Sequence, residues 1–469
     1  MRPTRWQKPR WQKPTNLYVA LGAFAFAAAV VAAATFFTTV GHGTTRMAVP
    51  APHPPVVTTP ALVPAGDSAE LPSPAGMAAW LAPVAADPNL GKLGARVTDA
   101  STGKELWQVA PDMPLVPAST NKLLTAAAAL LTLDPQTRVA TRVVAGSENP
   151  QGPVVLVGGG DPTLSAAPPG VATWYKGAAR ISDLVEQIHR SGVTPTAVQV
   201  DVSAFTGPTM APGWDDSDIW GGDIAPIEAA MIDAGRSQPT TEQSRRSTTP
   251  ALDAGRELAK ALGLDPGAVT IAPAPTGARQ LAVVESAPLI QRLSQMLNPS
   301  DNVMAECIAR EVAAAINRPR SFAGAVDAVT NRLNAAHADT SGSVLVDSSG
   351  LSVDDRLTAT TLSGVIQAVA GPDQPALRSL LDLLPIAAGS GTLADRFEPK
   401  GNAKASDQGP AGWLRAKTGS LTHTNSLVGV LTDRSGRVLT FALLSNDAGP
   451  AGQTAMDALA TRLWACGCR

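Results

Sequence analysis

Hydrophobic and polar positions divide this chain into three stretches of different character. Residues 17–40 hold 24 positions without a charged side chain, and a helix of that length reaches about 36 Å, enough to cross a bilayer core. Residues 41–75 are rich in proline among small and polar residues, which is typical of an extended spacer. From residue 76 onward apolar residues recur with the periods of helices and strands, which predicts a folded body.

Within the folded body, strand-like stretches lie near both ends and helical stretches lie between them. The strand-like stretches form two predicted hairpins, 93–99 with 106–110 and 427–432 with 438–444. Helical periodicity covers 117–131, 288–297, 302–316 and 453–464. This order predicts an α/β (α+β) body in which the two chain ends build one antiparallel sheet that helices cover.

Residues 145–285 differ in texture from their surroundings. They are richer in glycine, proline and aspartate and carry short strand-like runs at 154–157 and 198–202, which indicates an inserted domain. The expected division is listed in chain order: a basic arm at 1–16, a transmembrane anchor at 17–40, a linker at 41–75, a main domain at 76–144 plus 286–469, and the inserted domain at 145–285.

The formal net charge of −2 conceals an asymmetry between the chain's start and its body. Five cations lie within the first thirteen residues, Arg2, Arg5, Lys8, Arg10 and Lys13, so the remainder carries −7. A neutral total excludes a globally basic nucleic-acid binder. Basic residues before an apolar span remain in the cytoplasm, so we expect the body outside the cell membrane. A cleaved signal peptide, with the alanines at 32–34 as its cleavage site, is the alternative.

The three cysteines are Cys307, Cys466 and Cys468. A single glycine separates the last two, a spacing that disfavours an ordinary disulfide between them. We therefore expect no disulfide framework. Cys307 falls on a predicted helix and is expected to be a buried apolar residue rather than a reactive thiol.

Three short motifs follow in order: Ser119-Thr120-Asn121-Lys122, Ser300-Asp301-Asn302 and Lys417-Thr418-Gly419. Together they form the signature of penicillin-recognising serine enzymes. Lysine is scarce, with 10 lysines against 27 arginines, so a lysine in each of two motifs is stronger evidence for a functional signature than in an average protein. Imitations of the first two motifs occur at 101–104 and 147–149, but both fall in predicted turns, where side chains share no fixed face.

The first motif has the chemistry of an activated nucleophile. Residues three apart share a face of a helical turn, so the Lys122 amine can reach the Ser119 hydroxyl and act as its base once burial lowers the amine's pKa. We expect Ser300 to relay a proton towards the leaving group. We also expect the backbone N–H groups of Ser119 and Ser420 to form an oxyanion hole.

The remaining motif residues are candidates for holding the substrate. Asn302 is expected to hydrogen-bond the substrate amide, while Lys417 and Thr418 bind its terminal carboxylate. Gly419 is expected to let the substrate backbone lie close to the strand. No metal-binding or phosphate-binding motif occurs in the sequence, so neither a cofactor nor a metal is expected. His423 lies near the third motif and is assigned to the rim or core, since lysine already supplies the base.

With these motifs, residues 80–465 resemble the D-alanyl-D-alanine carboxypeptidases of the class C low-molecular-mass penicillin-binding proteins, the penicillin-binding protein 4 group. Segments 158–164, 347–352 and 384–393 are also similar to that family. The resemblance implies a serine β-lactamase/transpeptidase-like fold with a five-stranded antiparallel sheet. It implies peptidoglycan stem peptides as substrate, β-lactam antibiotics as covalent inhibitors and a bacterial location.

Two other functions share these motifs. A β-lactamase would place about 60 residues between the first two motifs, whereas here Ser119 and Ser300 are 181 apart, which leaves room for an inserted domain. A non-catalytic wall scaffold would not need all of the reactive residues that are present. The sequence does not separate carboxypeptidase from D,D-endopeptidase activity.

Overall fold

The computed structural model describes residues 69–398 and 409–468. The predicted basic arm, the anchor at 17–40 and all but the last residues of the linker lie outside these ranges. Within the ranges, none of the helices has the length and apolar character that crossing a membrane requires. The described residues all belong to the compact unit that spans Pro64–Arg469.

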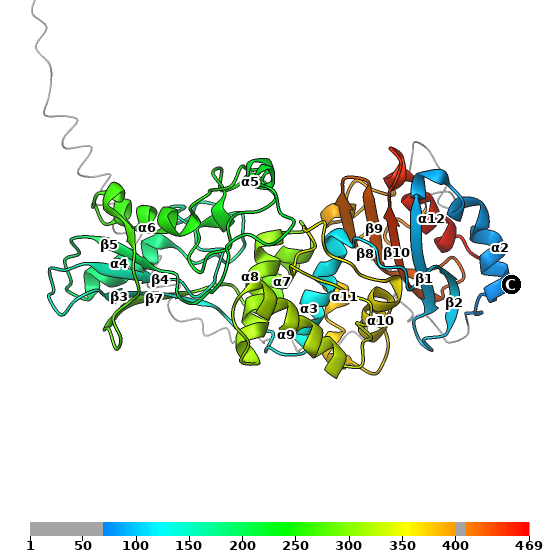
Figure 1. The fold of residues 1–469 in the computed structure, drawn as a ribbon, viewed down its shortest axis with the longest axis horizontal. Coiled ribbons are helices and arrows are strands. Elements are labelled where there is room, and N and C mark those ends of the chain that lie inside the picture. Colours follow the sequence, from blue (N-terminus) through cyan, green and yellow to red (C-terminus); the bar gives the residue numbers. More distant parts are fainter. Residues whose placement is uncertain (1–68, 399–408, 469) are drawn as a thin grey trace, which may run out of the picture. The chain divides into compact units, whose positions relative to one another are not determined.

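Strands from both ends of the folded body build the first sheet, as the sequence predicts. Its order is β2-β1-β10-β9-β8 and every neighbouring pair is antiparallel. Figure 1 shows the blue strands β1 and β2 beside the orange-red strands β8 to β10. The strand bounds are β1 Lys92–Asp99, β2 Glu105–Val109, β8 Leu414–Leu421, β9 Thr424–Thr432 and β10 Val438–Asn446. The predicted five-stranded antiparallel sheet is therefore confirmed.

Helices cover both faces of this sheet because its strands alternate apolar residues between the faces. Leu443 belongs to a core cluster shared with Leu81 and Leu459 of the two helices on one face. Leu444, one residue later, belongs to a separate cluster on the other face. The first face carries α2 Pro74–Ala85 and α12 Gly452–Trp464. Outside residues 140–285, the α-helices whose residues join the second cluster are α3 Lys122–Leu130, α7 Leu289–Leu297, α8 Asn302–Ala315, α9 Phe322–Ala335, α10 Ala359–Ala370 and α11 Leu380–Leu383.

Residues 140–285, here called the second lobe, contain a second sheet of order β6-β5-β4-β3-β7. It is mixed, because β4, β5 and β6 run parallel while β3 is antiparallel to both of its neighbours. The strand bounds are β3 Ala140–Ala145, β4 Val154–Val157, β5 Val198–Asp201, β6 Thr270–Ile271 and β7 Gln280–Glu285. The helices are α4 Ile181–Arg190, α5 Asp216–Gly221 and α6 Pro250–Ala261. The expected boundary at residue 145 thus falls at the end of β3. The division into domains stays a prediction.

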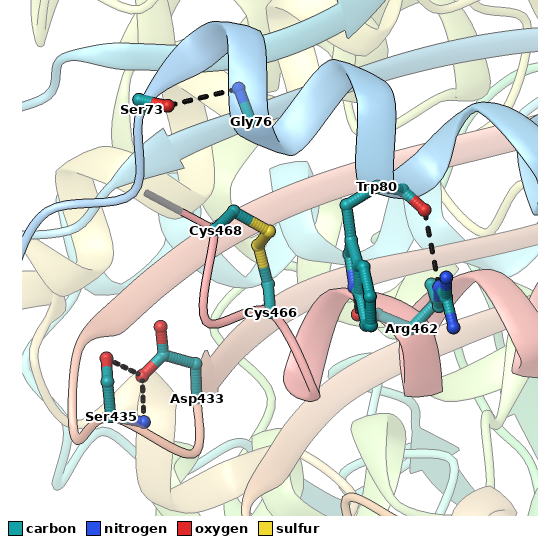
Figure 2. The surroundings of a disulfide bond; sticks show 8 residues. All are labelled: Ser73, Gly76, Trp80, Asp433, Ser435, Arg462, Cys466 and Cys468. Carbon is teal, nitrogen blue, oxygen red and sulfur yellow. Dashed lines mark hydrogen bonds between the residues drawn. A yellow bond between two sulfur atoms is a disulfide. The ribbon is translucent and has the colours of Figure 1, made fainter.

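The expectation for the last two cysteines is wrong. Cys466 and Cys468 form a disulfide, with their Cα atoms 5.1 Å apart, a separation that a disulfide accommodates. The chain turns back at Gly467 after α12. The carbonyl of Cys468 then accepts a hydrogen bond from the Ser73 backbone N–H at 3.0 Å. Figure 2 shows the bond beside the stacked side chains of Trp80 and Arg462. The disulfide thus lies at the chain end, where Cys466 belongs to the core cluster shared with α2 and α12. Cys307 is buried and free, as expected.

Candidate active site

Ser119 lies on a short 3₁₀ turn, Ala118–Asn121, that leads directly into α3. Two glycines hold this turn from opposite sides. A Cβ atom on Gly350 would lie 1.9 Å from the Ala118 carbonyl oxygen, and one on Gly419 would lie 2.8 Å from the Pro117 carbonyl oxygen. Both contacts are too close for a side chain, so only glycine fits. A glycine at 419 is thus required by the protein's own packing, and its expected role in giving the substrate backbone room stays a prediction.

Lys122 is fully buried one turn after Ser119. Its Nζ lies 2.9 Å from Ser119 Oγ and donates to Asn302 Oδ1 at 2.5 Å and to the Ser349 carbonyl at 2.8 Å. A neutral amine has two N–H bonds and one lone pair. When the two N–H bonds of this neutral form are directed at Asn302 Oδ1 and the Ser349 carbonyl, the lone pair is left for the Ser119 hydroxyl, whereas the charged form donates to all three oxygens. Burial lowers the pKa of Lys122 to about 8, although nearby carboxylates, Asp347 foremost, act in the opposite direction.

The second motif forms the next wall of the site. Ser300 precedes α8 and has a left-handed backbone, with φ of +64°, which is rare for a residue with a side chain. Asp301 caps α8 by accepting a hydrogen bond from the Met304 N–H at 2.9 Å. Asn302 turns its amide oxygen to Lys122 and donates through Nδ2 to the Asp223 carbonyl at 3.0 Å. The contact between Lys122 and Asn302 brings the first two motifs together.

The third motif lies on β8, opposite the first. Lys417 is fully buried, and its Nζ donates to Ser300 Oγ at 2.9 Å and to the Thr418 carbonyl at 2.8 Å. Burial, and then the like charge of Lys122, hold the pKa of Lys417 well below its ordinary value. Thr418 Oγ1 lies 2.6 Å from Thr392 Oγ1.

A cleft of about 630 Å³ opens over these residues. The motif residues on its wall are Ser119, Ser300, Asn302, Thr418 and Ser420. Both serines assigned to the oxyanion hole, Ser119 and Ser420, thus face one cleft, and that role stays a prediction. Lys122 and Lys417 lie buried behind the wall. Further charged groups come from elsewhere in the chain: Asp218, Asp223 and Glu242 of the second lobe, and Arg396, which pairs with Asp457.

Comparison with models of known protein families shows which family the chain belongs to. The model of the D-Ala-D-Ala carboxypeptidase 3 (S13) family matches residues 77–245 and 237–463. The chain belongs to this family. The family resemblance that the motifs predict is therefore confirmed, and the protein is a serine-type peptidase. Residues 1–64 match a separate model, the N-terminal domain of Carboxypeptidase Rv3627c-like proteins.

Two relatives cover nearly the whole chain. It is 74% identical to Carboxypeptidase Rv3627c of Mycobacterium tuberculosis, over 98% of this chain and 99% of the relative. It is 58% identical to Carboxypeptidase DacB of Mycolicibacterium smegmatis, over 100% of both. Among solved structures, penicillin binding protein 4 (dacB) from Haemophilus influenzae matches with a TM-score of 0.68 and 20% identity, over 84% of this chain and 99% of that one. The structural match supports the fold.

Sequence reasoning gave no role to a layer of buried acids behind Lys122 in this S13 peptidase. Asp347 accepts hydrogen bonds from the backbone N–H groups of Ser349 and Gly350, at 3.0 and 2.6 Å. These bonds hold the Ser349 carbonyl at Lys122. Burial, followed by the charge of Asp347, raises the pKa of the neighbouring Asp355 to about 10, so Asp355 is neutral at pH 7. The family-like segment 347–352 is the sequence signal that marks this layer.

The imitation motifs lie away from the cleft, as predicted. Ser101 is exposed in the β1–β2 turn and donates to Asp99 Oδ1 at 2.8 Å. Ser147 is exposed between β3 and β4. His423 lies exposed in the β8–β9 turn with Nδ1 3.1 Å from the Ala448 carbonyl, which fits the expected rim position.

Proposed function

We propose that this S13 peptidase removes the terminal D-alanine from peptidoglycan stem peptides through an acyl-enzyme on Ser119. The observation that carries the proposal is the 2.9 Å contact of the buried Lys122 amine with Ser119 Oγ, beside its contacts with Asn302 Oδ1 and the Ser349 carbonyl. Such an amine can take the hydroxyl proton as the serine attacks. The two relatives that cover nearly the whole chain are named carboxypeptidases, which supports this activity.

In the proposed acylation, Ser119 Oγ bonds to the carbonyl carbon of the penultimate D-alanine while its proton moves to Lys122 Nζ. The carbonyl oxygen gains a negative charge, which the N–H groups of Ser119 and Ser420 stabilise. The carbon–nitrogen bond then breaks. The departing nitrogen takes the proton that Lys122 received, relayed through the Ser300 hydroxyl, so Lys122 is neutral again and terminal D-alanine leaves. Water next attacks the ester carbonyl and gives one proton to Lys122. The bond between that carbon and Ser119 Oγ then breaks, Ser119 Oγ takes the proton from Lys122, and the shortened peptide leaves with a new carboxylate.

The proposed substrate is held by the second and third motifs. Asn302 orients the stem-peptide amide, and Lys417 with Thr418 binds the terminal carboxylate. Burial and the like charge of Lys122 hold the pKa of Lys417 well below its ordinary value, and a bound carboxylate raises that pKa again because it supplies the opposite charge. Carboxylate binding and protonation of Lys417 are therefore coupled, which favours substrates that end in a free carboxylate.

β-Lactams present a strained amide and a carboxylate in the same arrangement, so we propose that they acylate Ser119. A solved structure of penicillin binding protein 4 from Haemophilus influenzae, of the same fold, is a complex with a β-lactam.

A labelling experiment tests the proposed nucleophile. Fluorescent penicillin should label the wild type stably, and Ser119→Ala should abolish the label. Ser101→Ala is the matched control, because it removes the serine of the imitation motif and should label normally. If Ser119→Ala labels like the wild type, the nucleophile is assigned to the wrong residue, and rapid loss of the label would indicate a β-lactamase. Mass spectrometry of digested stem peptides should show loss of D-alanine, and cleavage of cross-links would reveal additional endopeptidase activity.

We also propose a location. Residues 17–40 anchor the protein in the bacterial cell membrane, residues 1–16 remain in the cytoplasm, and the linker at 41–75 lets the peptidase reach the wall. The support is the uncharged run and the five preceding cations. The full chain should fractionate with membranes and resist extraction by salt, while a chain lacking residues 1–40 should be released. Recovery of a mature protein that starts after residue 34 would show a cleaved signal peptide instead.

A further inference from the structure

The middle residue of the second motif, Asp301, does not face the cleft. It is 5% exposed, and its two carboxylate oxygens have separate partners. Oδ1 caps α8 through the Met304 N–H. Oδ2 accepts a hydrogen bond from the Tyr175 hydroxyl at 2.5 Å and forms an ion pair with Arg236 Nη2 at 3.2 Å. The residue between Ser300 and Asn302 is thus fixed from both sides.

Both partners of Oδ2 come from the second lobe. Tyr175 is 1% and Arg236 is 7% exposed, and neither lines the cleft. Arg236 Nη1 also donates to the Tyr175 hydroxyl at 2.7 Å, so the three side chains close a ring of contacts. The Arg236 guanidinium lies over the ring of Trp174, 4.8 Å from its centroid, which holds it in place from a further side. We call the pair Tyr175 and Arg236 the clamp.

The clamp acts on a segment that needs restraint. Ser300 has a left-handed backbone, a conformation that costs an L residue about 1 to 2 kcal/mol and lasts only where neighbours enforce it. Ser300 Oγ meets Lys417, and Asn302 Oδ1 meets Lys122. A small shift of Asp301 would therefore move both residues away from the two lysines, and a misplacement of about 1 Å can slow an enzyme by about a hundredfold.

The ion pair between Asp301 and Arg236 of the clamp also keeps its charges across the working pH range. Burial by itself raises the pKa of Asp301. The charges of Arg236 and Arg246, with the hydrogen bonds from Tyr175 and the Met304 N–H, lower it to about 2. The carboxylate therefore stays ionised and paired with Arg236 at every pH at which Lys122 can serve as the base.

We propose that Tyr175 and Arg236 are positioning residues, through which the second lobe fixes Ser300 and Asn302 for acyl transfer. This inference rests on the proposed function of Ser119. It assigns the second lobe a part in the chemistry of the first two motifs, although the clamp touches no substrate.

The test compares Tyr175→Phe, Arg236→Met and the double variant in acylation by fluorescent penicillin at saturating and subsaturating concentrations. Tyr175→Phe removes one oxygen and keeps the ring. The first-order acylation step should slow about tenfold in Tyr175→Phe and about a hundredfold in Arg236→Met, with penicillin binding before acylation changed less than about twofold. Because both residues act on one carboxylate, the double variant should be no slower than Arg236→Met.

Arg180→Gln is the matched control. Arg180 lies in the second lobe and donates to the carbonyls of Ala167, Pro168 and Val171. Its loss perturbs the lobe without touching Asp301, so the acylation step should stay at the wild-type rate. Thermal unfolding identifies any variant that fails to fold, and Tyr175→Phe then decides alone.

Three outcomes overturn the inference. A folded Tyr175→Phe that acylates at the wild-type rate overturns it, as does a loss confined to penicillin binding or an equal slowing in Arg180→Gln. Absence of label on the wild type would overturn the proposed function, and the clamp with it, and is distinguished by that result from failure of the clamp alone.

Discussion

The buried Lys122 predicts how the rate of acylation depends on pH. Burial lowers the pKa of this amine from 10.5 to about 8 in the folded protein. Only the neutral amine can accept the Ser119 proton. The neutral fraction is about 1% at pH 6, about 10% at pH 7 and about 50% at pH 8, by the definition of a pKa. The acylation rate should therefore rise about tenfold from pH 6 to 7, about fivefold from 7 to 8, and level off above 9.

The lowered pKa of Lys122 also makes the unfolding free energy depend on pH. The folded-state pKa is below the unfolded value, so between pH 8 and 10.5 the unfolded chain binds more protons. The contribution of Lys122 therefore destabilises the fold fully below pH 8, by about 3 kcal/mol at about 1.36 kcal/mol per pKa unit. This cost is lost as the pH rises to 10.5. The enzyme thus lowers the pH at which its base becomes neutral at a cost in unfolding free energy.

The assay is the second-order rate constant for acylation by fluorescent penicillin from pH 6 to 9.5, corrected for spontaneous hydrolysis of the reagent. Lys92→Gln is the control, because Lys92 is exposed and pairs with Asp447 on the surface, 2.9 Å away. Its profile should match that of the wild type. A wild-type rate that stays flat between pH 6 and 9, or that falls, would refute Lys122 as the base.

Two further predictions concern the frame of the site. Gly419→Ala places a Cβ atom 2.2 Å from Ser426 Oγ and 2.8 Å from the Pro117 carbonyl oxygen. The unfolding free energy should therefore fall by about 1 to 3 kcal/mol, and labelling by penicillin should slow. Labelling at the wild-type rate would contradict this close approach. Asp355 has its pKa raised above the unfolded value by burial and by Asp347, so its contribution to stability is lost as pH rises towards 10. The unfolding free energy of Asp355→Asn, measured with urea, should therefore rise relative to that of the wild type between pH 6 and 9. A difference in unfolding free energy that does not change with pH would refute a neutral Asp355.

Sequence alone predicted the serine peptidase chemistry and about half of the α-helices and strands that the structure describes. Ser119 and Lys122 share a face because they are three residues apart, and the 302–316 stripe predicts α8 for the same reason. Such patterns depend on neighbours within one or two turns of chain. They are readable without the fold, and they also carry the family resemblance.

Only the tertiary structure decided which distant groups complete the site. Tyr175 and Asp301 are 126 residues apart, and Lys122 and the Ser349 carbonyl are 227 apart. Their meeting depends on how the sheet, helices and second lobe close around one another, which no local pattern records. The Cys466–Cys468 disulfide depends on the path of the backbone after α12, which the spacing of the two cysteines did not predict. A lysine's identity gives its ordinary pKa, but burial by residues far along the chain makes it a base near neutral pH.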